Sequence, residues 1–216
     1  STLFEGAEGF ERARRDSLPA SLPTVVYYFT TWCPYCRRFE SEVLAAPEVE
    51  RFLQGPWIKV RVNPESSSED RDFADRYGVN GYPTVLLLWG EDRPRQVPTS
   101  APNDFVETLE SLRRRWLAER LAQARRERDS GQPAAATATL DSVLALEPEL
   151  AAALIERALA RGESGAVENA LDDLRRAAAL DGEDLNIYTA LDRLLTPQRR
   201  RDEIKPARPK QRINGS

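Results

Sequence analysis

The stretch TVVYYFTTWCPYC, at residues 24–36, leads from a run of β-branched and aromatic residues into a Cys-x-x-Cys pair. Residues 24–29 form a continuous run of this kind, which is typical of a strand buried on both faces. A helical pattern follows the pair, with a bend or a new start expected at Pro47. Cys33 and Cys36 therefore lie between a buried strand and the beginning of a helix. This context indicates redox chemistry rather than half of a zinc site.

The composition excludes several other kinds of chemistry. The 216 residues contain two Cys and no His, which excludes Ser-His-Asp and Cys-His catalysis. Two cysteines cannot form a structural zinc site alone, and a disulfide across so short a loop adds little stability. A net charge of −4 argues against nucleic-acid binding, and no apolar run approaches the roughly 20 residues of a membrane span. We therefore expect no metal, no nucleic acid and no membrane-spanning segment.

The beginning of the chain and its first half carry two further expectations. Because the chain has no Met, we expect that a tag, signal or anchor segment has been removed before Ser1. The first half has an α/β pattern, which predicts one domain over residues 1–112, with a mixed sheet flanked by helices. The predicted elements besides the central strand are a helix at 4–17, a strand at 57–62, a helix at 66–77, a strand at 84–89 and an edge strand at 95–97.

The two cysteines have different predicted roles. A helix N-terminus presents unpaired N–H groups and a partial positive charge, which favour the thiolate of Cys33. We expect Cys33 to be the exposed nucleophile and Cys36, one turn further along, to resolve the mixed disulfide. Pro34 suits the first helical turn because its missing N–H costs nothing there. Trp32, Pro34 and Tyr35 are predicted to form part of the substrate surface, with core packing as the alternative for Trp32.

A second motif, GYPT at residues 81–84, leads into the last buried strand. A proline that begins a strand often follows a cis peptide bond, although a trans bond is the alternative. Pro83 lies 47 residues after Cys36 in the same α/β unit, which favours the cis form. A cis bond would place the Tyr82 backbone against Cys33, ready to pair with an extended substrate. Tyr82 and Pro83 are therefore predicted to bind substrate.

The second half of the chain is predicted to be entirely helical. After about residue 100, Ala, Leu, Arg and Glu dominate and strand patterns disappear. The sequence then repeats with a period of 34 residues, so that Gly131, Ala136, Leu140 and Leu144 correspond to Gly165, Ala170, Leu174 and Ala178. This period resembles the tetratricopeptide (TPR) pattern, which implies helix pairs near 117–150 and 151–184 and a capping helix after them.

The limits of this helical region are also predicted. The TPR-like domain is expected over residues 113–198, and the basic segment at 199–216 is expected to be disordered. The repeat lacks the Trp and Tyr of a strong TPR consensus. An ordinary helical appendage is therefore the alternative to a TPR-like domain.

The motifs of the first half resemble those of the thioredoxin superfamily. The resemblance covers residues 24–110 and rests on TTWCPYC at 30–36 and GYPT at 81–84. It implies an α/β thioredoxin fold and a thiol–disulfide oxidoreductase. Within the superfamily, FESE at 39–42 and APEV at 46–49 are most similar to the C-terminal periplasmic domain of the bacterial electron conductor DsbD. The GYPT motif also occurs in protein disulfide isomerases.

Departures from the family patterns change what the resemblance implies. Cys-Pro-Tyr-Cys is the glutaredoxin pair, but residues 86–90 are LLLWG where glutaredoxins have a Gly-Gly glutathione motif, so we expect no glutathione site. Thioredoxins keep a buried carboxylate six residues before the first cysteine, where this chain has Tyr27. Glu40 is on the same helix face as Cys36 and is our candidate proton acceptor, with a solvent-exposed glutamate as the alternative. Arg61 is a candidate compensating charge.

The predicted function is disulfide exchange with protein substrates, and the TPR-like half is predicted to supply a docking surface. We expect no cofactor besides the redox-active Cys33–Cys36 pair, and a separate redox partner protein must recharge it. The alternative is a holdase, because a thioredoxin domain joined to a TPR domain resembles the YbbN-type chaperedoxins; a third reading is a scaffold with a redox switch. The DsbD-like features favour the bacterial periplasm, whereas the chaperedoxin-like architecture favours the cytoplasm.

Overall fold

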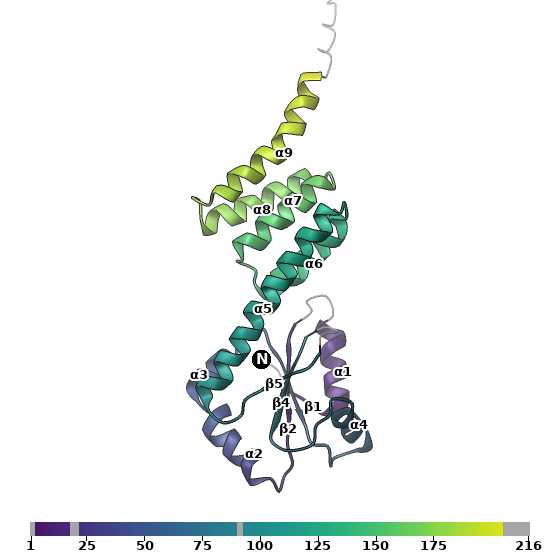
Figure 1. Ribbon diagram of the computed structural model, residues 1–216, viewed down its shortest axis with the longest axis vertical. Coiled ribbons are helices and arrows are strands. Elements are labelled where there is room, and N and C mark those ends of the chain that lie inside the picture. Colours follow the sequence, from purple (N-terminus) through teal and green to yellow (C-terminus); the bar gives the residue numbers. More distant parts are fainter. Residues whose placement is uncertain (1–2, 18–21, 90–92, 205–216) are drawn as a thin grey trace, which may run out of the picture. The chain divides into compact units, whose positions relative to one another are not determined.

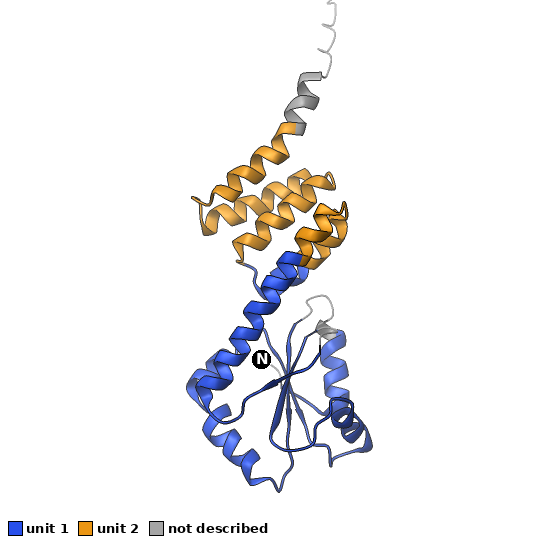
Figure 2. Cartoon of the chain, in the orientation of Figure 1, with its two compact units in different colours: residues 1–122, 141–148 blue, residues 123–140, 149–216 orange. Residues whose placement is uncertain are grey.

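The computed structural model describes residues 3–17, 22–89 and 93–204, which belong to two compact units (Figures 1 and 2). The first unit comprises residues 1–122 and 141–148, and the second comprises residues 123–140 and 149–216. The predicted division of the chain, between residues 112 and 113, falls inside one helix, α5 (Pro102–Asp129).

A five-stranded mixed sheet forms the centre of the first unit (Figure 1). Its strands are β1 (Leu3–Glu5), β2 (Thr24–Tyr28), β3 (Ile58–Val62), β4 (Thr84–Leu88) and β5 (Arg95–Val97). They lie in the order β1-β3-β2-β4-β5; β1 and β2 run parallel to β3, and β4 runs antiparallel to both β2 and β5. Every residue of β2 is buried, as expected for a central strand covered on both faces. The predicted fold class is thus confirmed.

The N-terminal segment differs from its prediction as a helix over residues 4–17. Leu3–Glu5 form β1, and α1 (Gly6–Ser17) begins only after this strand. Strand β1 lies along β3 with Phe4 opposite Val60, so the outer edge of β3 gains backbone hydrogen-bonding partners. A strand of three residues is too short to carry a recognisable alternation, which is why the sequence pattern missed it.

Helices cover both faces of the sheet (Figure 1). On one face lie α1 and α4 (Ser68–Arg76); on the other lie α2 (Pro34–Phe39), α3 (Pro47–Phe52) and the beginning of α5. Helix α2 continues into a π-helical turn, η1 (Glu40–Leu44), and the chain starts a new helix at Pro47, as predicted. A π-helical turn is uncommon and is often found at functional sites.

Aromatic side chains fill the core on each side of the sheet. Phe10 of α1 packs on Phe73 of α4, with ring centroids 4.7 Å apart. On the opposite face, Phe39 of α2 packs on Phe105 of α5, with ring centroids 5.9 Å apart. Both members of each pair are almost completely buried. The second contact fixes α2 against α5, and so fixes the cysteine pair at the carboxyl end of β2.

The described part of the second unit is helical. It comprises the end of α5, part of α6 (Pro133–Leu146), α7 (Ala151–Glu163), α8 (Val167–Leu180) and α9 (Leu185–Ile204). The turns that follow α5 and α7 are alike, because Gly131 and Gly165 have φ angles of 76° and 82°. In both turns, the residue after the glycine donates its N–H to the carbonyl oxygen five residues earlier. The backbone therefore repeats the 34-residue period of the sequence.

The buried side chains of the second unit follow the same period. Ala136 and Ala170 are both fully buried, and Leu140 and Leu174 have exposed fractions of only 1% and 2%. Small residues at equivalent places allow adjacent helices to approach closely. The repeated alanine and the first repeated leucine are thus core residues of the helices that follow each turn, whereas Ala178, which corresponds to the buried Leu144, is exposed.

The C-terminal end of the chain was predicted to be disordered from residue 199. Helix α9 continues to Ile204, so residues 199–204 are helical. Residues 205–216 lie outside the described residues. Among the helices that the structure describes, none combines the length and the apolar character that crossing a membrane requires.

Candidate active site

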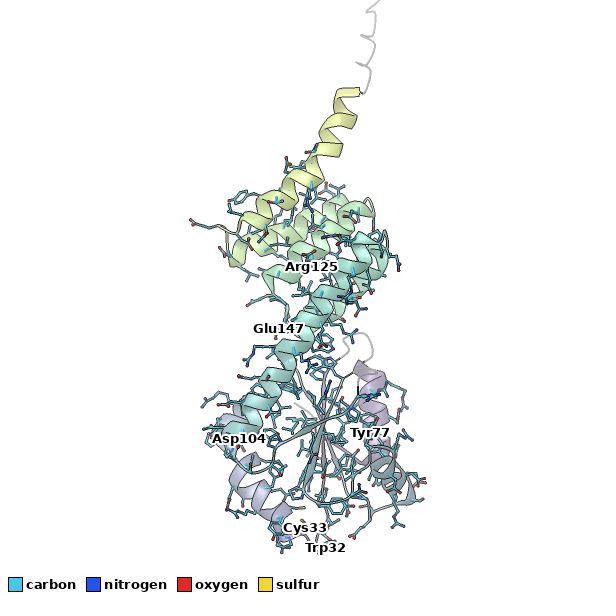
Figure 3. The ribbon with its side chains drawn as sticks, viewed as in Figure 1. Trp32, Cys33, Tyr77, Asp104, Arg125 and Glu147 are labelled. Atoms are coloured by element: carbon cyan, nitrogen blue, oxygen red, sulfur yellow. The ribbon has the colours of Figure 1, made fainter. Side chains whose placement is uncertain are left out.

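Cys33 lies at the N-cap of α2, at one end of the first unit together with Trp32 (Figure 3). Its backbone is extended, with φ of −71° and ψ of 112°, as is usual for an N-cap residue. The backbone N–H of Cys36 donates to Cys33 Sγ at 3.1 Å. This donor would stabilise a thiolate on Cys33, in the way that an N-cap oxygen accepts from the first helical turn.

The burial of Cys33 differs from the prediction of an exposed nucleophile. Cys33 is only 3% exposed and Cys36 only 1%, and both are free thiols. Cys33 Sγ is directed inward, where it contacts the Cys36 N–H and lies 3.6 Å from the carbonyl oxygen of Tyr82. The sulfur is thus held by backbone groups from two segments, and exposure does not separate the two cysteines.

The two thiols differ instead in their surroundings, and those of Cys36 affect its pKa. The pKa of Cys36 is raised to about 11, first by burial and then by a hydrogen bond with the Cys33 side chain. Hydrogen bonds from the Thr30 backbone and the Tyr27 side chain act in the opposite direction, because they favour the thiolate. Cys36 is therefore protonated at neutral pH and needs a proton acceptor before it attacks a disulfide.

Tyr27, Glu40 and Arg61 form a cluster beside Cys36. The Tyr27 hydroxyl donates to Glu40 Oε1 at 3.2 Å and lies 3.5 Å from the carbonyl oxygen of Cys36. Arg61 Nη2 lies 3.6 Å from the same Glu40 oxygen, and its guanidinium stacks over the Phe29 ring at 4.4 Å. Glu40 is not buried among apolar groups, since 40% of its side chain is exposed. Glu40 and Arg61, both candidates from the sequence, thus lie next to each other, and Tyr27 contacts both Glu40 and Cys36.

The aromatic residues around the cysteines face outward. Trp32 is 62% exposed and Tyr35 is 70% exposed, so core packing is not the role of Trp32. The Trp32 indole N–H donates to both carboxylate oxygens of Glu65 at 3.0 Å. Trp32 directly precedes Cys33, and Tyr35 lies between the two cysteines, so both exposed rings are next to the dithiol.

A groove of about 840 Å³ lies next to the dithiol. Tyr35 and Phe39 line one side, and Tyr82 and Pro83 line another; the Tyr82–Pro83 peptide bond is cis. The remaining lining residues carry no local motif by which the sequence could mark them; these are Arg38, Glu42, Val43 and residues 96–100. The groove thus has a mixed polar and apolar lining.

These features define a thiol–disulfide oxidoreductase with the thioredoxin fold. The dithiol begins a helix after the central strand, Cys33 faces a carbonyl oxygen next to a cis proline, and Cys36 has a raised pKa. Among the described residues, no group of three or more His, Cys, Asp or Glu side chains is placed to hold a metal ion.

The chain belongs to the thioredoxin-like family, whose model matches residues 10–113. The thioredoxin of Synechocystis sp. is 30% identical over 98 residues, which are 45% of this chain and 86% of that protein. The thiol:disulfide interchange protein DsbD of Cronobacter sakazakii is 26% identical over 85 residues, 39% of this chain and 14% of that protein. Among solved structures, a thioredoxin from Thermus thermophilus is 21% identical with a TM-score of 0.43, covering 52% of this chain and 88% of that chain.

Proposed function

We propose that this oxidoreductase exchanges disulfides with protein substrates, which lie in the groove beside Cys33. The observation that carries the proposal is the juxtaposition of Cys33 Sγ and the Tyr82 carbonyl oxygen, 3.6 Å apart, at the edge of that groove. A backbone carbonyl beside the nucleophile can accept an N–H from an extended substrate strand. Trp32 and Tyr35, which are exposed next to Cys33, supply apolar contact area for such a strand.

The exchange proceeds in two steps. The Cys33 thiolate attacks one sulfur of the substrate disulfide, a mixed disulfide forms, and the other substrate sulfur leaves as a thiolate. Cys36 then loses its proton and attacks Cys33 Sγ, which forms the Cys33–Cys36 disulfide and releases the second substrate thiolate. The dithiol has then given two electrons to the substrate. The pair itself is the redox-active group, so the proposal includes no further cofactor, and a separate redox partner protein restores the dithiol.

The direction of net exchange follows from the reduction potential of the pair. Equilibration of the full chain with mixtures of reduced and oxidised glutathione, followed by quantification of both protein forms, measures this potential. A potential as low as that of thioredoxin, about −270 mV, favours reduction of substrates, whereas one near −120 mV favours their oxidation. A chain that never forms the intramolecular disulfide in any of these mixtures would contradict the proposal.

Glu40 is proposed as the proton acceptor for Cys36. Replacing Glu40 by Gln keeps a hydrogen-bond acceptor for Tyr27 but removes the basic carboxylate, so we expect the resolving step at neutral pH to slow by about tenfold or more. The rate of mixed-disulfide resolution in stopped flow measures this effect. Glu48→Gln, at an exposed glutamate in the first turn of α3, is the matched control and should leave the rate unchanged. An unchanged rate in Glu40→Gln would assign Glu40 to the solvent-exposed alternative.

The helical unit is proposed to be a TPR-like docking surface for protein clients. Its repeated glycine turns and buried alanines support two equivalent helix pairs, as the sequence period implies. A groove of about 230 Å³ is lined by α5, α7 and α9, which occupy equivalent places in the repeat. Arg193, Thr189 and Ile155 are among its lining residues.

If protein clients dock in this groove, a substitution in its lining should change the affinity for the client and leave the disulfide exchange itself unchanged. Arg193→Glu should raise the KM for a disulfide-bonded protein client severalfold and leave kcat unchanged, because it alters the groove lining and not the dithiol. Reduction of a small aromatic disulfide should also be unchanged. Arg175→Glu, at an exposed arginine of α8, is the control for a change of charge alone. Equal KM values in the two variants would argue against docking in this groove.

A holdase that mainly binds unfolded clients is the second proposal for the chain as a whole. The exposed apolar side chains Leu180, Leu185 and Tyr188, at the end of α8 and the beginning of α9, favour it. The double substitution Cys33→Ser and Cys36→Ser separates the two functions. If this variant suppresses aggregation of an unfolded client as well as the native chain does, binding is the main role. If the suppression of aggregation depends on the thiols, disulfide exchange is the main role.

The compartment in which the protein works is also a proposal. The likeness to part of DsbD supports the bacterial periplasm, and the likeness to thioredoxins supports the cytoplasm. We propose the periplasm, where a protein-directed dithiol has structural disulfides to act upon. Fractionation of the source cell, with immunodetection of this chain, tests the proposal, and recovery with the cytoplasm would contradict it.

A further inference from the structure

Tyr27 contacts both the resolving cysteine and the proposed proton acceptor. Its hydroxyl donates to Glu40 Oε1 at 3.2 Å, lies 3.5 Å from the Cys36 carbonyl oxygen, and interacts electrostatically with the Cys36 thiol. The ring is packed between Phe29 and Phe39, with centroid distances of 5.4 and 5.3 Å, so the hydroxyl has little freedom to turn away. Tyr27 comes from β2, whereas Cys36 of α2 and Glu40 of η1 lie four residues apart on the adjoining helical segments.

We propose that the Tyr27 hydroxyl relays the proton from the Cys36 thiol to Glu40 during the resolving step; this inference rests on the exchange proposed above. The Tyr27 oxygen accepts the thiol proton while its own hydroxyl proton passes to the Glu40 carboxylate. Cys36 becomes a thiolate, Glu40 becomes a neutral acid, and Tyr27 regains the neutral hydroxyl. The proton then leaves Glu40 for water, which reaches this partly exposed side chain.

In this scheme Tyr27 transfers the proton through its neutral hydroxyl and does not act as a base. Burial raises the pKa of Tyr27 well above its ordinary value, and the electrostatic influence of Cys36 and Glu40 acts in the same direction. The phenol therefore stays neutral over the range in which the exchange operates. A neutral hydroxyl that accepts from one partner and donates to the other can pass a proton without ever carrying a charge for long.

Arg61 acts as a positioning residue for the acceptor. Its guanidinium is fixed over Phe29 and pairs with the Glu40 oxygen that receives the Tyr27 hydrogen bond. The other titratable groups that face Cys36 are Cys33, in the same turn, and Tyr82, across the groove. On the α5 side, the apolar Phe105 packs on Phe39 of the helix that carries Cys36. The hydroxyl of Tyr27 is thus the group that connects the Cys36 thiol to the Glu40–Arg61 pair.

The test compares the resolving step in the full chain and in Tyr27→Phe, which keeps the ring and removes the hydroxyl. The reduced protein is mixed with dithiobis(nitrobenzoate), which releases one coloured thiolate when Cys33 attacks and a second when Cys36 resolves. We expect the second phase of Tyr27→Phe to be slower by about tenfold at neutral pH and the first phase to be unchanged. The difference should disappear as the pH approaches about 11, where Cys36 ionises without help.

Three comparisons make the outcome specific to the relay. Glu40→Gln and Tyr27→Phe should slow the second phase to a similar extent. The double variant should be little slower than either single variant, because both substitutions interrupt the same route of proton transfer. Tyr28→Phe, which removes the buried hydroxyl of the next residue on β2, should behave like the native chain. A packing defect would instead slow the reaction equally at every pH.

Two results would overturn the proposals separately. If Tyr27→Phe keeps the native second-phase rate and pH profile, the relay is wrong, while the dithiol exchange stands. If the native chain itself releases only the first thiolate, the exchange proposed above is wrong, and the relay falls with it.

Discussion

Cys33→Ser removes all disulfide exchange, and Cys36→Ser stops the reaction at the mixed disulfide. A serine hydroxyl is not ionised at neutral pH and is a far weaker nucleophile, so we expect the rate of substrate reduction to fall by more than about a thousandfold in Cys33→Ser. In Cys36→Ser the first attack remains, because Cys33 keeps its place beside the Tyr82 carbonyl oxygen. Turnover with a disulfide-bonded protein substrate and mass spectrometry of trapped adducts measure the two effects.

The adduct in Cys36→Ser is the sharper of these measurements. It should contain substrate joined through Cys33, and a thiol reductant should release it. Circular dichroism of both variants is the control for folding, since each replaces one buried sulfur by a smaller oxygen. An adduct that forms equally well in Cys33→Ser would mean that Cys36 is the attacking thiol, and the assigned roles would have to be exchanged.

Asp173→Asn destabilises the helical unit by about 3–5 kcal/mol. The Asp173 carboxylate is 2% exposed and accepts from Arg157 at 2.6 and 2.9 Å and from Arg161 at 2.8 Å. Removing the negative charge leaves these guanidinium groups, one of them buried, facing a neutral amide. Urea unfolding followed by far-ultraviolet circular dichroism measures the free energy of unfolding.

The adjacent residue provides a matched control for this prediction. Asp172 pairs with Arg175 on the surface of the same helix, and both side chains are 67% exposed. Asp172→Asn should change the free energy of unfolding by no more than about 0.5 kcal/mol, because water screens exposed pairs. All four Trp of the chain lie in the first unit, so their fluorescence follows that unit separately. Equal midpoints for the two variants would mean that the buried cluster contributes no more than a surface pair.

The features that local patterns encode were predictable from the sequence. The strand at Thr24–Tyr28 is uniformly buried because its residues are β-branched or aromatic, and this is visible without any partner strand. The helix restart at Pro47 follows from the chemistry of proline alone. The 34-residue period in the second half likewise marks turns that the backbone repeats.

Features that depend on distant segments were not predictable in the same way. Strand β1 forms because β3 offers a free edge, which three residues of sequence cannot show. Cys33 is buried because its sulfur turns toward Tyr82, 49 residues away in the chain. The bridging position of Tyr27 required knowing which face of β2 meets the helix, and a strand buried on both faces has no polar alternation to indicate it.

The matching turns at Gly131 and Gly165 bear on how this chain can change in length. Because the chain reverses direction in the same way every 34 residues, one repeat of this length can be inserted or deleted while the remaining helices keep their packing partners. Duplication of a 34-residue segment would then add a layer to the helical unit and leave residues 24–36 untouched. Homologues of different length should therefore differ by multiples of this interval, with the dithiol at a constant distance from the first turn.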